Sequence, residues 1–309
     1  MMKLVFLDAS TLGSTSLAPI AELGELVCYP VSSPSEALER VKDADIIITN
    51  KVKITAELLD AAPKLRLVCE AATGVNNIDL VAAEQRNIPV KNVSGYSTDS
   101  VVQLTFALIL ELVCKTSKNS AWIKDGYYSK HPIFTKLDSP FMDLSGRTIG
   151  IVGMGTIGSK VAKVAEAFGM KVVYFSTSGT SHCKEYPSLS LEELLSTADI
   201  VSIHAPLNEK TINLIDAPQL ALMKKNAIII NIGRGGIVNE KALADAISAC
   251  GIAGAGLDVF TCEPLPQDHP LLHTTHPERL CMTPHLGWAS EDSLKRLVAG
   301  VAANIKSLQ

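Results

Sequence analysis

Residues 148–158, with the sequence TIGIVGMGTIG, contain an apolar run followed by three closely spaced glycines. The apolar run 148–152 is typical of a buried parallel strand, and Gly153, Gly155 and Gly158 follow it in the pattern G-x-G-x-x-G. A helical period of apolar residues comes next and stops at Gly169. The first glycine permits a tight turn, the second lets backbone approach a pyrophosphate, and the third lets the helix pack on the strand. The stretch therefore predicts a Rossmann-type unit, and a ligand-free glycine-rich turn is the alternative.

Three side chains suited to acid–base chemistry follow separate apolar runs. The runs 227–232, 252–260 and 280–283 are predicted to be buried parallel strands, and they are followed by Arg234, Glu263 and His285. In an open α/β sheet the ligand crevice lies outside the carboxyl ends of the strands. Each residue taken singly is more typical of a surface ion pair, a turn or a loop. Their joint occurrence predicts one cleft with an acid–base pair and an anion-binding group.

The pattern of apolar runs and helix-like segments divides the chain into two α/β units. Strands are predicted at 3–7, 26–29, 45–49, 65–69 and 90–93, and capping boxes at 33–36 and 190–193 begin one helix in each half. A long helix is expected from about 97–100 to 115, and a last helix over 298–308 is expected to return to the first domain. We predict two doubly wound parallel-sheet domains. They are a flavodoxin-like substrate domain at 1–98 plus 289–309, and a Rossmann dinucleotide-binding domain at 99–288.

Composition indicates a protein that acts on small molecules. The 309 residues are 47% hydrophobic and carry a net charge of −4, with no Lys/Arg run longer than two, so nothing indicates a nucleic-acid partner. Seven cysteines without a C-x-x-C pair fit a reducing cytosol. The start of the chain reads as a strand and not as a signal peptide, and the longest apolar run, 106–113, is too short to span a membrane. We therefore expect a cytoplasmic location and no membrane partner.

Two further segments have open interpretations. Five of the fifteen aromatic residues lie in 121–146 without regular periodicity. We predict a dimerisation arm at about 119–146, and a loop folded back on its own domain is the alternative.

The trio His269, His273 and His276 has a spacing compatible with a metal site, but Pro270 and Pro277 break any helical face, so a solvated loop is favoured and no metal is expected.

Several motifs together carry a resemblance to a known family. They are TGVNNID at 73–79, the glycines of 153–158, NIGRGG at 231–236, GLDVF at 256–260 with Glu263-Pro264, and PHLGW at 284–288. This set resembles the D-isomer-specific 2-hydroxyacid dehydrogenase family over nearly the whole chain. Residues 96–106, YSTDSVVQLTF, are similar to the glycerate dehydrogenase (hydroxypyruvate reductase) branch in particular.

The resemblance implies a role for each candidate residue. His285 would protonate the nascent alkoxide as hydride passes from a nicotinamide to a 2-oxo acid, while Glu263 would hold its tautomer and stabilise the imidazolium. Arg234 offers a planar fork to the substrate carboxylate. The backbone of Gly74, Val75 and Asn76 would be a second carboxylate holder, although a plain Gly/Asn turn is the alternative. The remaining implied cofactor contacts are Val102, Gly153, Gly155, Thr156, Ile157, Gly158, Pro206, Thr211, Ile232 and Asp258, the last at the nicotinamide amide.

The choice of cofactor is predicted from the end of the second Rossmann strand. An NAD-specific fold usually has Asp or Glu about 20 residues after the glycines. Here Ser176, Thr177 and Ser178 occupy that place, and the stretch continues without a carboxylate through Ser181. Hydroxyls and backbone N–H groups would accept a 2′-phosphate that an acid would repel, so NADP is favoured over NAD.

The sequence therefore predicts an NAD(P)-dependent reductase of small 2-oxo acids such as hydroxypyruvate or glyoxylate.

 The alternatives are a non-catalytic NAD(P)-binding regulatory protein on the same scaffold, and a D-3-phosphoglycerate or phenylpyruvate-type dehydrogenase. The intact set of Arg234, Glu263 and His285 favours an enzyme, and a homodimer is the expected assembly.

Overall fold

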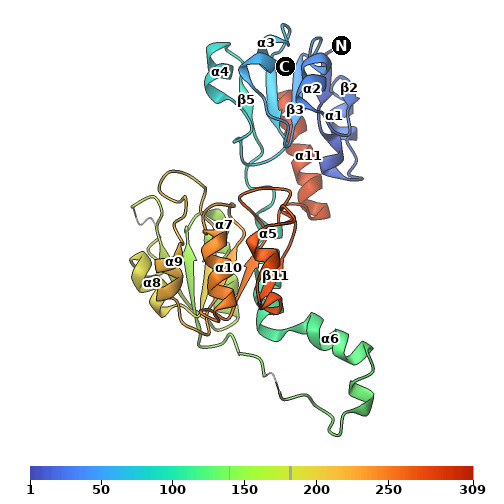
Figure 1. The fold of residues 1–309 in the computed structure, drawn as a ribbon. Helices are drawn as coiled ribbons and strands as arrows, with labels where there is room; N and C mark the ends of the chain where they lie inside the picture. The colour runs from blue at the N-terminus through green and yellow to red at the C-terminus, as the bar shows by residue number, and fades with distance from the viewer. Residues whose placement is uncertain (139, 181–182, 309) are drawn as a thin grey trace. The chain divides into compact units, whose positions relative to one another are not determined.

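The computed structural model describes residues 1–138, 140–180 and 183–308. The chain forms two compact units. The N-terminal unit comprises Met1–Asp99 and Trp288–Gln309, and the central unit comprises Ser100–Gly287. The predicted boundaries at 98/99 and 288/289 lie one residue from these divisions. Each unit is described by itself below (Figure 1).

The N-terminal unit is built on a five-stranded parallel sheet of order β2-β1-β3-β4-β5. This is the strand order of flavodoxin-like folds, so the predicted fold class is confirmed for this unit. Side chains alternate between the two faces, because Leu4 and Phe6 contribute to one apolar cluster and Val5 to the other. The strands are β1 (Lys3–Phe6), β2 (Glu25–Cys28), β3 (Ile46–Thr49), β4 (Leu67–Glu70) and β5 (Val90–Lys91).

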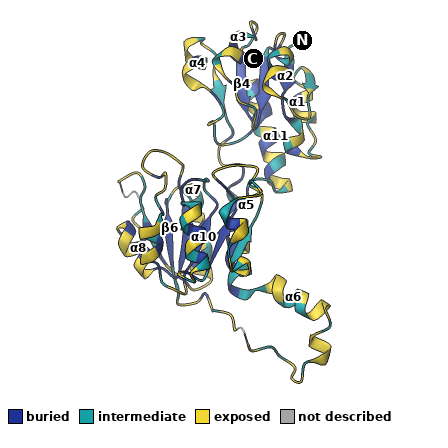
Figure 2. Ribbon diagram, in the orientation of Figure 1, coloured by how far each residue is buried: buried dark blue, intermediate teal, exposed yellow. Residues whose placement is uncertain are grey.

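Helices cover both faces of this sheet. The cluster that contains Leu4 also takes side chains from α1 and α11, whereas the cluster that contains Val5 takes them from α2, α3 and α4. Figure 2 shows the strands buried beneath helices whose outer faces are exposed. The helices are α1 (Ala18–Ala21), α2 (Pro34–Arg40), α3 (Ala56–Asp60), α4 (Leu80–Gln85) and α11 (Glu291–Lys306), with a 3₁₀ helix, η1 (Ala9–Leu12).

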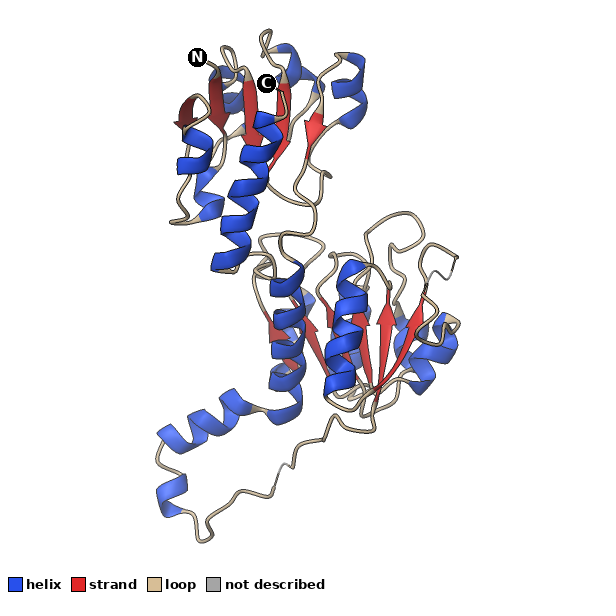
Figure 3. Cartoon of the chain, turned by 180° about the vertical axis from the view of Figure 1, so that it is seen from behind, coloured by secondary structure: helices blue, strands red, loops and turns tan. Residues whose placement is uncertain are grey.

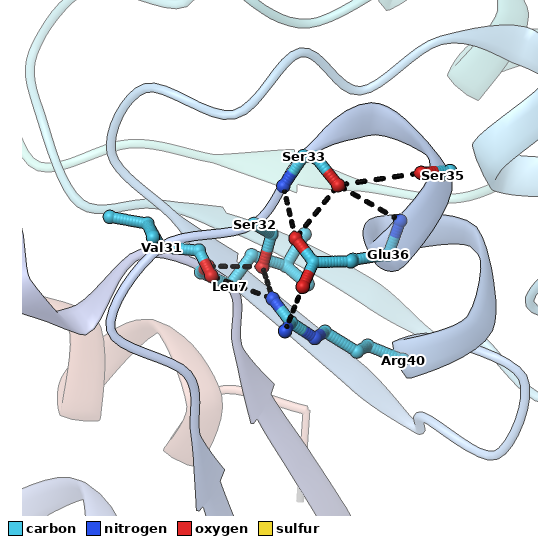
Figure 4. A network of polar contacts seen from close by, with 7 residues as sticks. All are labelled: Leu7, Val31, Ser32, Ser33, Ser35, Glu36 and Arg40. Atoms are coloured by element: carbon cyan, nitrogen blue, oxygen red, sulfur yellow. Dashed lines mark hydrogen bonds and ion pairs between the residues drawn. The ribbon is translucent and has the colours of Figure 1, made fainter.

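The capping box predicted at the start of α2 is present (Figure 4). The Ser33 Oγ accepts a hydrogen bond from the Glu36 backbone N–H at 3.4 Å, and the Glu36 carboxylate accepts one from the Ser33 backbone N–H at 2.8 Å. Arg40 then donates to Glu36 Oε1 at 2.8 Å and to the Val31 carbonyl at 2.6 Å. The box therefore fixes both the first turn of α2 and the loop that enters it.

The last helix begins earlier than the sequence pattern indicates. Helix α11 starts at Glu291, seven residues before the predicted 298, with Ser290 as the N-cap that accepts from the Ser293 N–H. Its first turns are polar and charged, so the apolar period became visible only from Leu297 onward. The signal for the true start was the serine cap followed by Glu291 and Asp292 in the first turn.

The central unit is built on a six-stranded parallel sheet of order β11-β10-β9-β8-β6-β7 (Figure 3). Strand β7 lies on one side of β6 and the later strands lie on the other, so the direction of winding reverses at β6. This confirms the second doubly wound domain. The strands are β6 (Thr148–Val152), β7 (Lys171–Phe175), β8 (Ile200–Ile203), β9 (Ile228–Asn231), β10 (Gly254–Leu257) and β11 (Leu280–Met282).

Two apolar clusters cover the faces of this sheet. One cluster combines strand residues with α5 (Thr98–Cys114) and α7 (Thr156–Ala167). The other combines them with α8 (Leu191–Thr197), α9 (Ala217–Leu222) and α10 (Glu240–Ser248). The capping box predicted at Ser190 and Glu193 begins α8. Short 3₁₀ helices, η3 (Pro270–His273) and η4 (Pro277–Arg279), lie between β10 and β11.

The segment after α5 contains secondary structure that the sequence analysis did not predict. It forms α6 (Thr116–Lys124) and a 3₁₀ helix, η2 (Tyr128–Lys130), and neither contains a buried residue. Within the described part of the chain no single helix is long and apolar enough to cross a membrane. Helices α5 and α6 pass that test only as a pair, bent by 57° at their junction.

Candidate active site

Glu263 and His285 form a direct pair. Glu263 lies in the turn after β10 and His285 in the loop after β11, and Glu263 Oε2 is 2.7 Å from His285 Nδ1. The other carboxylate oxygen of Glu263 accepts from the Phe260 backbone N–H at 2.9 Å, which holds the turn around it. A carboxylate on Nδ1 fixes the tautomer of the imidazole and leaves Nε2 to exchange a proton with a substrate.

The loop that carries His285 is anchored by Asp258. Its carboxylate accepts hydrogen bonds from the Thr283 hydroxyl at 2.6 Å and from the backbone N–H groups of Leu286 and Gly287 at 2.9 and 2.8 Å. Burial raises the pKa of Asp258, and these hydrogen bonds oppose the shift. His285 itself has a φ of 51°, a left-handed conformation that few residues adopt without such support.

These contacts change the interpretation of Asp258. The family resemblance implies a contact of its carboxylate with the nicotinamide amide, but in the structure both oxygens accept hydrogen bonds from the loop of His285, and the residue is 1% exposed. Asp258 is therefore first a residue that positions the loop. A contact with the nicotinamide remains a prediction.

Arg234 lies at the end of the neighbouring strand, β9. Its guanidinium donates to the Gly233 carbonyl at 2.9 Å, and its own carbonyl accepts from the Asn231 amide at 2.9 Å. The next residue, Gly235, is in backbone contact with the turn after β10, because a Cβ there would lie 1.9 Å from the Phe260 carbonyl oxygen. The structure thus joins the turns that hold Arg234 and Glu263.

The glycine-rich turn between β6 and α7 has the geometry of a pyrophosphate cradle. Gly153 has a φ of 94°, and a Cβ on Gly158 would lie 2.2 Å from the Gly153 carbonyl oxygen. In contrast, a Cβ on Gly155, the N-cap of α7, would meet nothing within 4 Å. Open space at Gly155 and the N–H groups of the first turn of α7 fit an anionic diphosphate, so these residues would hold a dinucleotide there.

The other predicted cofactor residues have mixed surroundings. Thr156 and Ile157 form the first turn of α7, and Val102 and Ile232 are each only 6% exposed. The Thr211 hydroxyl donates to the Pro206 carbonyl at 2.7 Å and accepts from the Asn208 N–H, so it stabilises the loop after β8.

The end of β7 has no carboxylate among the described residues 176–180. The Ser176 hydroxyl donates to the Thr180 carbonyl at 2.7 Å and lies 3.1 Å from the Ser178 hydroxyl, with Thr177 between them. Ser181, the last residue of the predicted hydroxyl stretch, lies outside the described residues. The hydroxyls of Ser176 and Ser178 therefore form hydrogen bonds within the loop itself.

One polar residue of this region was not predicted. His204 follows β8, its Nε2 lies 2.8 Å from the Ser202 hydroxyl, and its Nδ1 is buried without a partner among the described residues. Burial lowers the pKa of His204 to about 3, so the ring is neutral at physiological pH. Its backbone contacts Gly153, since a Cβ on that glycine would lie 3.0 Å from the His204 carbonyl carbon. A histidine directly after a strand was the only available signal.

The loop of Gly74, Val75 and Asn76 follows β4 in the N-terminal unit. The neighbouring Asn77 amide donates to Glu70 Oε2 at 2.9 Å and to the Val52 carbonyl at 3.1 Å. Asn77 therefore anchors the loop to Glu70, at the end of β4, and to Val52. Burial raises the pKa of Glu70 to about 8, although the Asn77 hydrogen bond opposes this shift.

No cluster of three or more potential metal ligands occurs in the residues that the structure describes. Of the histidine trio, His269 instead lies 2.8 Å from Glu240 Oε2, and His273 Nε2 lies 3.0 Å from the Gln267 carbonyl.

A dinucleotide-binding sheet with an acid–base pair at its strand ends defines the class of nicotinamide-dependent oxidoreductases. Residues 106–287 match the family described as D-isomer specific 2-hydroxyacid dehydrogenase, NAD binding domain. A hydroxypyruvate reductase of Blautia hydrogenotrophica is 34% identical, and the match covers 99% of this chain and 96% of that protein. The chain therefore belongs to the D-isomer-specific 2-hydroxyacid dehydrogenase family and is an NAD(P)-dependent oxidoreductase.

Solved structures agree with this assignment. The D-lactate dehydrogenase of Aquifex aeolicus, in complex with NAD and lactic acid, is 28% identical with a TM-score of 0.85, covering 99% of this chain and 95% of that one. The NADPH-dependent glyoxylate/hydroxypyruvate reductase of Sinorhizobium meliloti is 25% identical with a TM-score of 0.86, covering 99% and 94%.

Proposed function

We propose that the protein reduces a short, polar 2-oxo acid, of the hydroxypyruvate or glyoxylate type, to the D-2-hydroxy acid. The observation that carries this proposal is the 2.7 Å contact between Glu263 and His285, in the same unit as the dinucleotide turn. A bound nicotinamide supplies the hydride. The chain supplies the proton, the anion-binding group and the orientation of both.

Each residue has a defined task in this proposal. The Arg234 guanidinium binds the substrate carboxylate, for which its planar fork is suited, and the backbone of Gly74, Val75 and Asn76 is a second candidate for that role. His285 donates the Nε2 proton to the oxygen of the substrate carbonyl as the alcohol forms. Glu263 stabilises the imidazolium before transfer and holds the ring afterwards. In oxidation the neutral ring takes the proton back.

A panel of 2-oxo acids tests the substrate class. Hydroxypyruvate and glyoxylate are expected to show higher kcat/KM than phenylpyruvate or 2-oxoisocaproate, assayed with NADPH and NADH separately. A site that hydrogen-bonds a substrate hydroxyl rejects analogues without it, whereas an apolar pocket gains only about 1 to 3 kcal/mol per methylene. A preference for phenylpyruvate would contradict the short-substrate proposal and leave the family assignment intact. No turnover with any 2-oxo acid would favour a regulatory protein.

We propose NADP as the preferred cofactor, and Ser176→Asp tests this. An aspartate there would bind a ribose diol and repel a 2′-phosphate, so the ratio of kcat/KM for NADH over NADPH should rise about tenfold or more, about 1.4 kcal/mol. Ser176→Asn is the matched control, because it has the same shape without the charge. An unchanged ratio in the aspartate variant, or an equal shift in the asparagine variant, would contradict the placement of the phosphate at this strand end.

We propose a homodimer formed through the arm at 119–146. Its apolar side chains are strongly exposed, including Phe134 at 88%, Leu137 at 70% and Phe141 at 64%. Light scattering at micromolar concentration should give twice the 33.0 kDa chain mass. Phe134→Asp with Leu137→Asp should shift the protein toward monomer, whereas Val81→Asp, at a site 65% exposed in the N-terminal unit, should not. A monomeric wild-type protein would refute the assembly.

A further inference from the structure

A cavity of about 570 Å³ lies at the amino-terminal edge of the central sheet. Arg147 directly precedes β6, Lys225 and Asn226 lie just before β9, and Arg279 directly precedes β11. All strands of this sheet run in the same direction (Figure 3). The cavity is therefore at the opposite edge from the glycine turn and from His285, and it cannot be part of the candidate active site.

The lining of the cavity is strongly basic. Five lining residues carry positive charge and one, Glu278, carries negative charge; the basic ones are Lys115, Lys118, Arg147, Lys225 and Arg279. The chain as a whole has 28 basic and 32 acidic residues, so this ratio is a local exception to its composition. Clustered like charges in a concave site raise the local concentration of counter-ions and favour a multivalent anion.

The acidic groups near the cavity form their direct ion pairs with basic residues that do not line it. Glu278 pairs with His276 at 3.2 Å, Asp199 with Lys224 at 3.0 Å and Asp138 with Lys136 at 3.0 Å. The lining residues Lys118, Arg147 and Arg279 also lower the pKa of Asp138, Asp199 and Glu278, respectively, but each does so less than the partner named above.

Two of the lining bases also have local structural tasks. Arg279 donates to the Ile252 carbonyl at 3.0 Å, and Lys115 stands at the carbonyl end of α5, where a cation is favoured. Lys118 and Lys225 are exposed and, within the described part of the chain, form no ion pair within 4.0 Å. They are the lysines most available to a ligand.

The apolar lining residues, apart from the exposed Pro140, are buried or half-buried, and we call them the floor of the cavity. They are Leu112, Val113, Met142, Ile228 and Ala253. The volume lies within the range of small-molecule sites, which run from about 300 to 1,000 Å³. A basic rim over an apolar floor suits a ligand with adjacent anionic groups on an apolar or aromatic body.

We propose that this cavity binds a small molecule with two or more linked phosphate groups, such as a nucleoside di- or triphosphate. Arg147 and Arg279 offer planar forks to phosphate oxygens, and the lysines act as mobile point charges. A single carboxylate would not require five basic groups. The site is independent of the reaction assigned to the strand ends, so it stands whichever 2-oxo acid is the substrate. Its lining includes Pro140 and Met142 of the arm proposed above to form a homodimer, so binding is tested on the protein in its assembled state.

Calorimetric titration with tripolyphosphate and with ATP tests the proposal. The protein is first saturated with NADPH or NADH, so that neither probe can occupy the glycine turn. Both probes are expected to bind saturably at low salt and to weaken as sodium chloride is raised. Lys118→Glu with Lys225→Glu should weaken binding at least about tenfold, because two attractive charges become repulsive. Lys163→Glu, on the exposed side of α7, is the matched control and should leave affinity within about twofold.

The two probes also separate the contributions of rim and floor. Equal affinities would mean that the phosphates alone are recognised, and tighter binding of ATP would mean that the floor holds its base; both outcomes support the site. Absence of saturable binding by either probe would overturn it. Equal loss of affinity in the double variant and in Lys163→Glu would also overturn it, because the effect would then be one of net charge.

Discussion

Replacing His285 with alanine is expected to lower kcat by at least about a hundredfold, the usual scale for loss of a general acid. The structural reason is the 2.7 Å contact with Glu263, which commits Nδ1 and leaves Nε2 as the proton donor. Steady-state kinetics of 2-oxo acid reduction measure the effect. His273→Ala is the control and should keep normal activity, because His273 is an exposed residue at the end of η3 whose ring contacts the Gln267 carbonyl.

The left-handed backbone at His285 calls for a second variant. Asparagine tolerates a φ of 51° better than alanine does, so His285→Asn separates loss of the imidazole from distortion of the loop. Both variants should lose activity to a similar extent. Wild-type reduction should also run best at lower pH than oxidation, because reduction uses the imidazolium and oxidation the neutral ring. Near-full activity in either variant would remove His285 from the mechanism.

Gly235→Ala is expected to destabilise the cofactor-free protein by about 3 kcal/mol, the upper end of the usual cost of overpacking. A methyl group there would lie 1.9 Å from the Phe260 carbonyl oxygen, and neither backbone can move without displacing the turn that leads to Glu263. For a domain of this size the cost corresponds to a fall in Tm of roughly 6 to 12 °C, measurable by circular dichroism. Activity should fall as well, since the same turn positions the catalytic carboxylate.

Gly155→Ala is the matched control for that substitution. Its methyl group would meet nothing within 4 Å, so the Tm of the cofactor-free protein should be unchanged. Cofactor affinity should fall instead, because the methyl group enters the space assigned to the pyrophosphate. If both variants have the Tm of the wild type, that result would contradict the close packing described between the turns after β9 and β10.

The parts of the fold that sequence could predict are those determined by local chemistry. The turn of Gly153 and Gly158 and the capping boxes of Ser33 and Ser190 are determined within a few residues, and the structure contains each of them. The contact of Glu263 with His285 was predictable because parallel strands end at one edge.

Other features depend on contacts that are distant in sequence. The hydrogen bonds by which Asp258 anchors the His285 loop join residues 25 to 29 positions apart, and no local sequence pattern predicts them. Helix α6 was missed because its sequence, TSKNSAWIK, buries no side chain and so lacks an apolar period. The basic cavity was not predicted because its lysines and arginines lie in or before four different elements, α6, β6, β9 and β11, and converge only in the folded protein.

Helix α11 has a consequence for the order in which the chain becomes native. Its residues Leu297, Val301 and Ile305 complete the cluster that covers one face of β1, β3 and β4, yet they are synthesised after the whole central unit. During translation the first 99 residues leave the ribosome with that face bare, whereas the central unit is contiguous and can finish folding before α11 exists. The N-terminal unit is therefore accessible to chaperones and prone to aggregation for longer than the central unit, although its synthesis begins earlier.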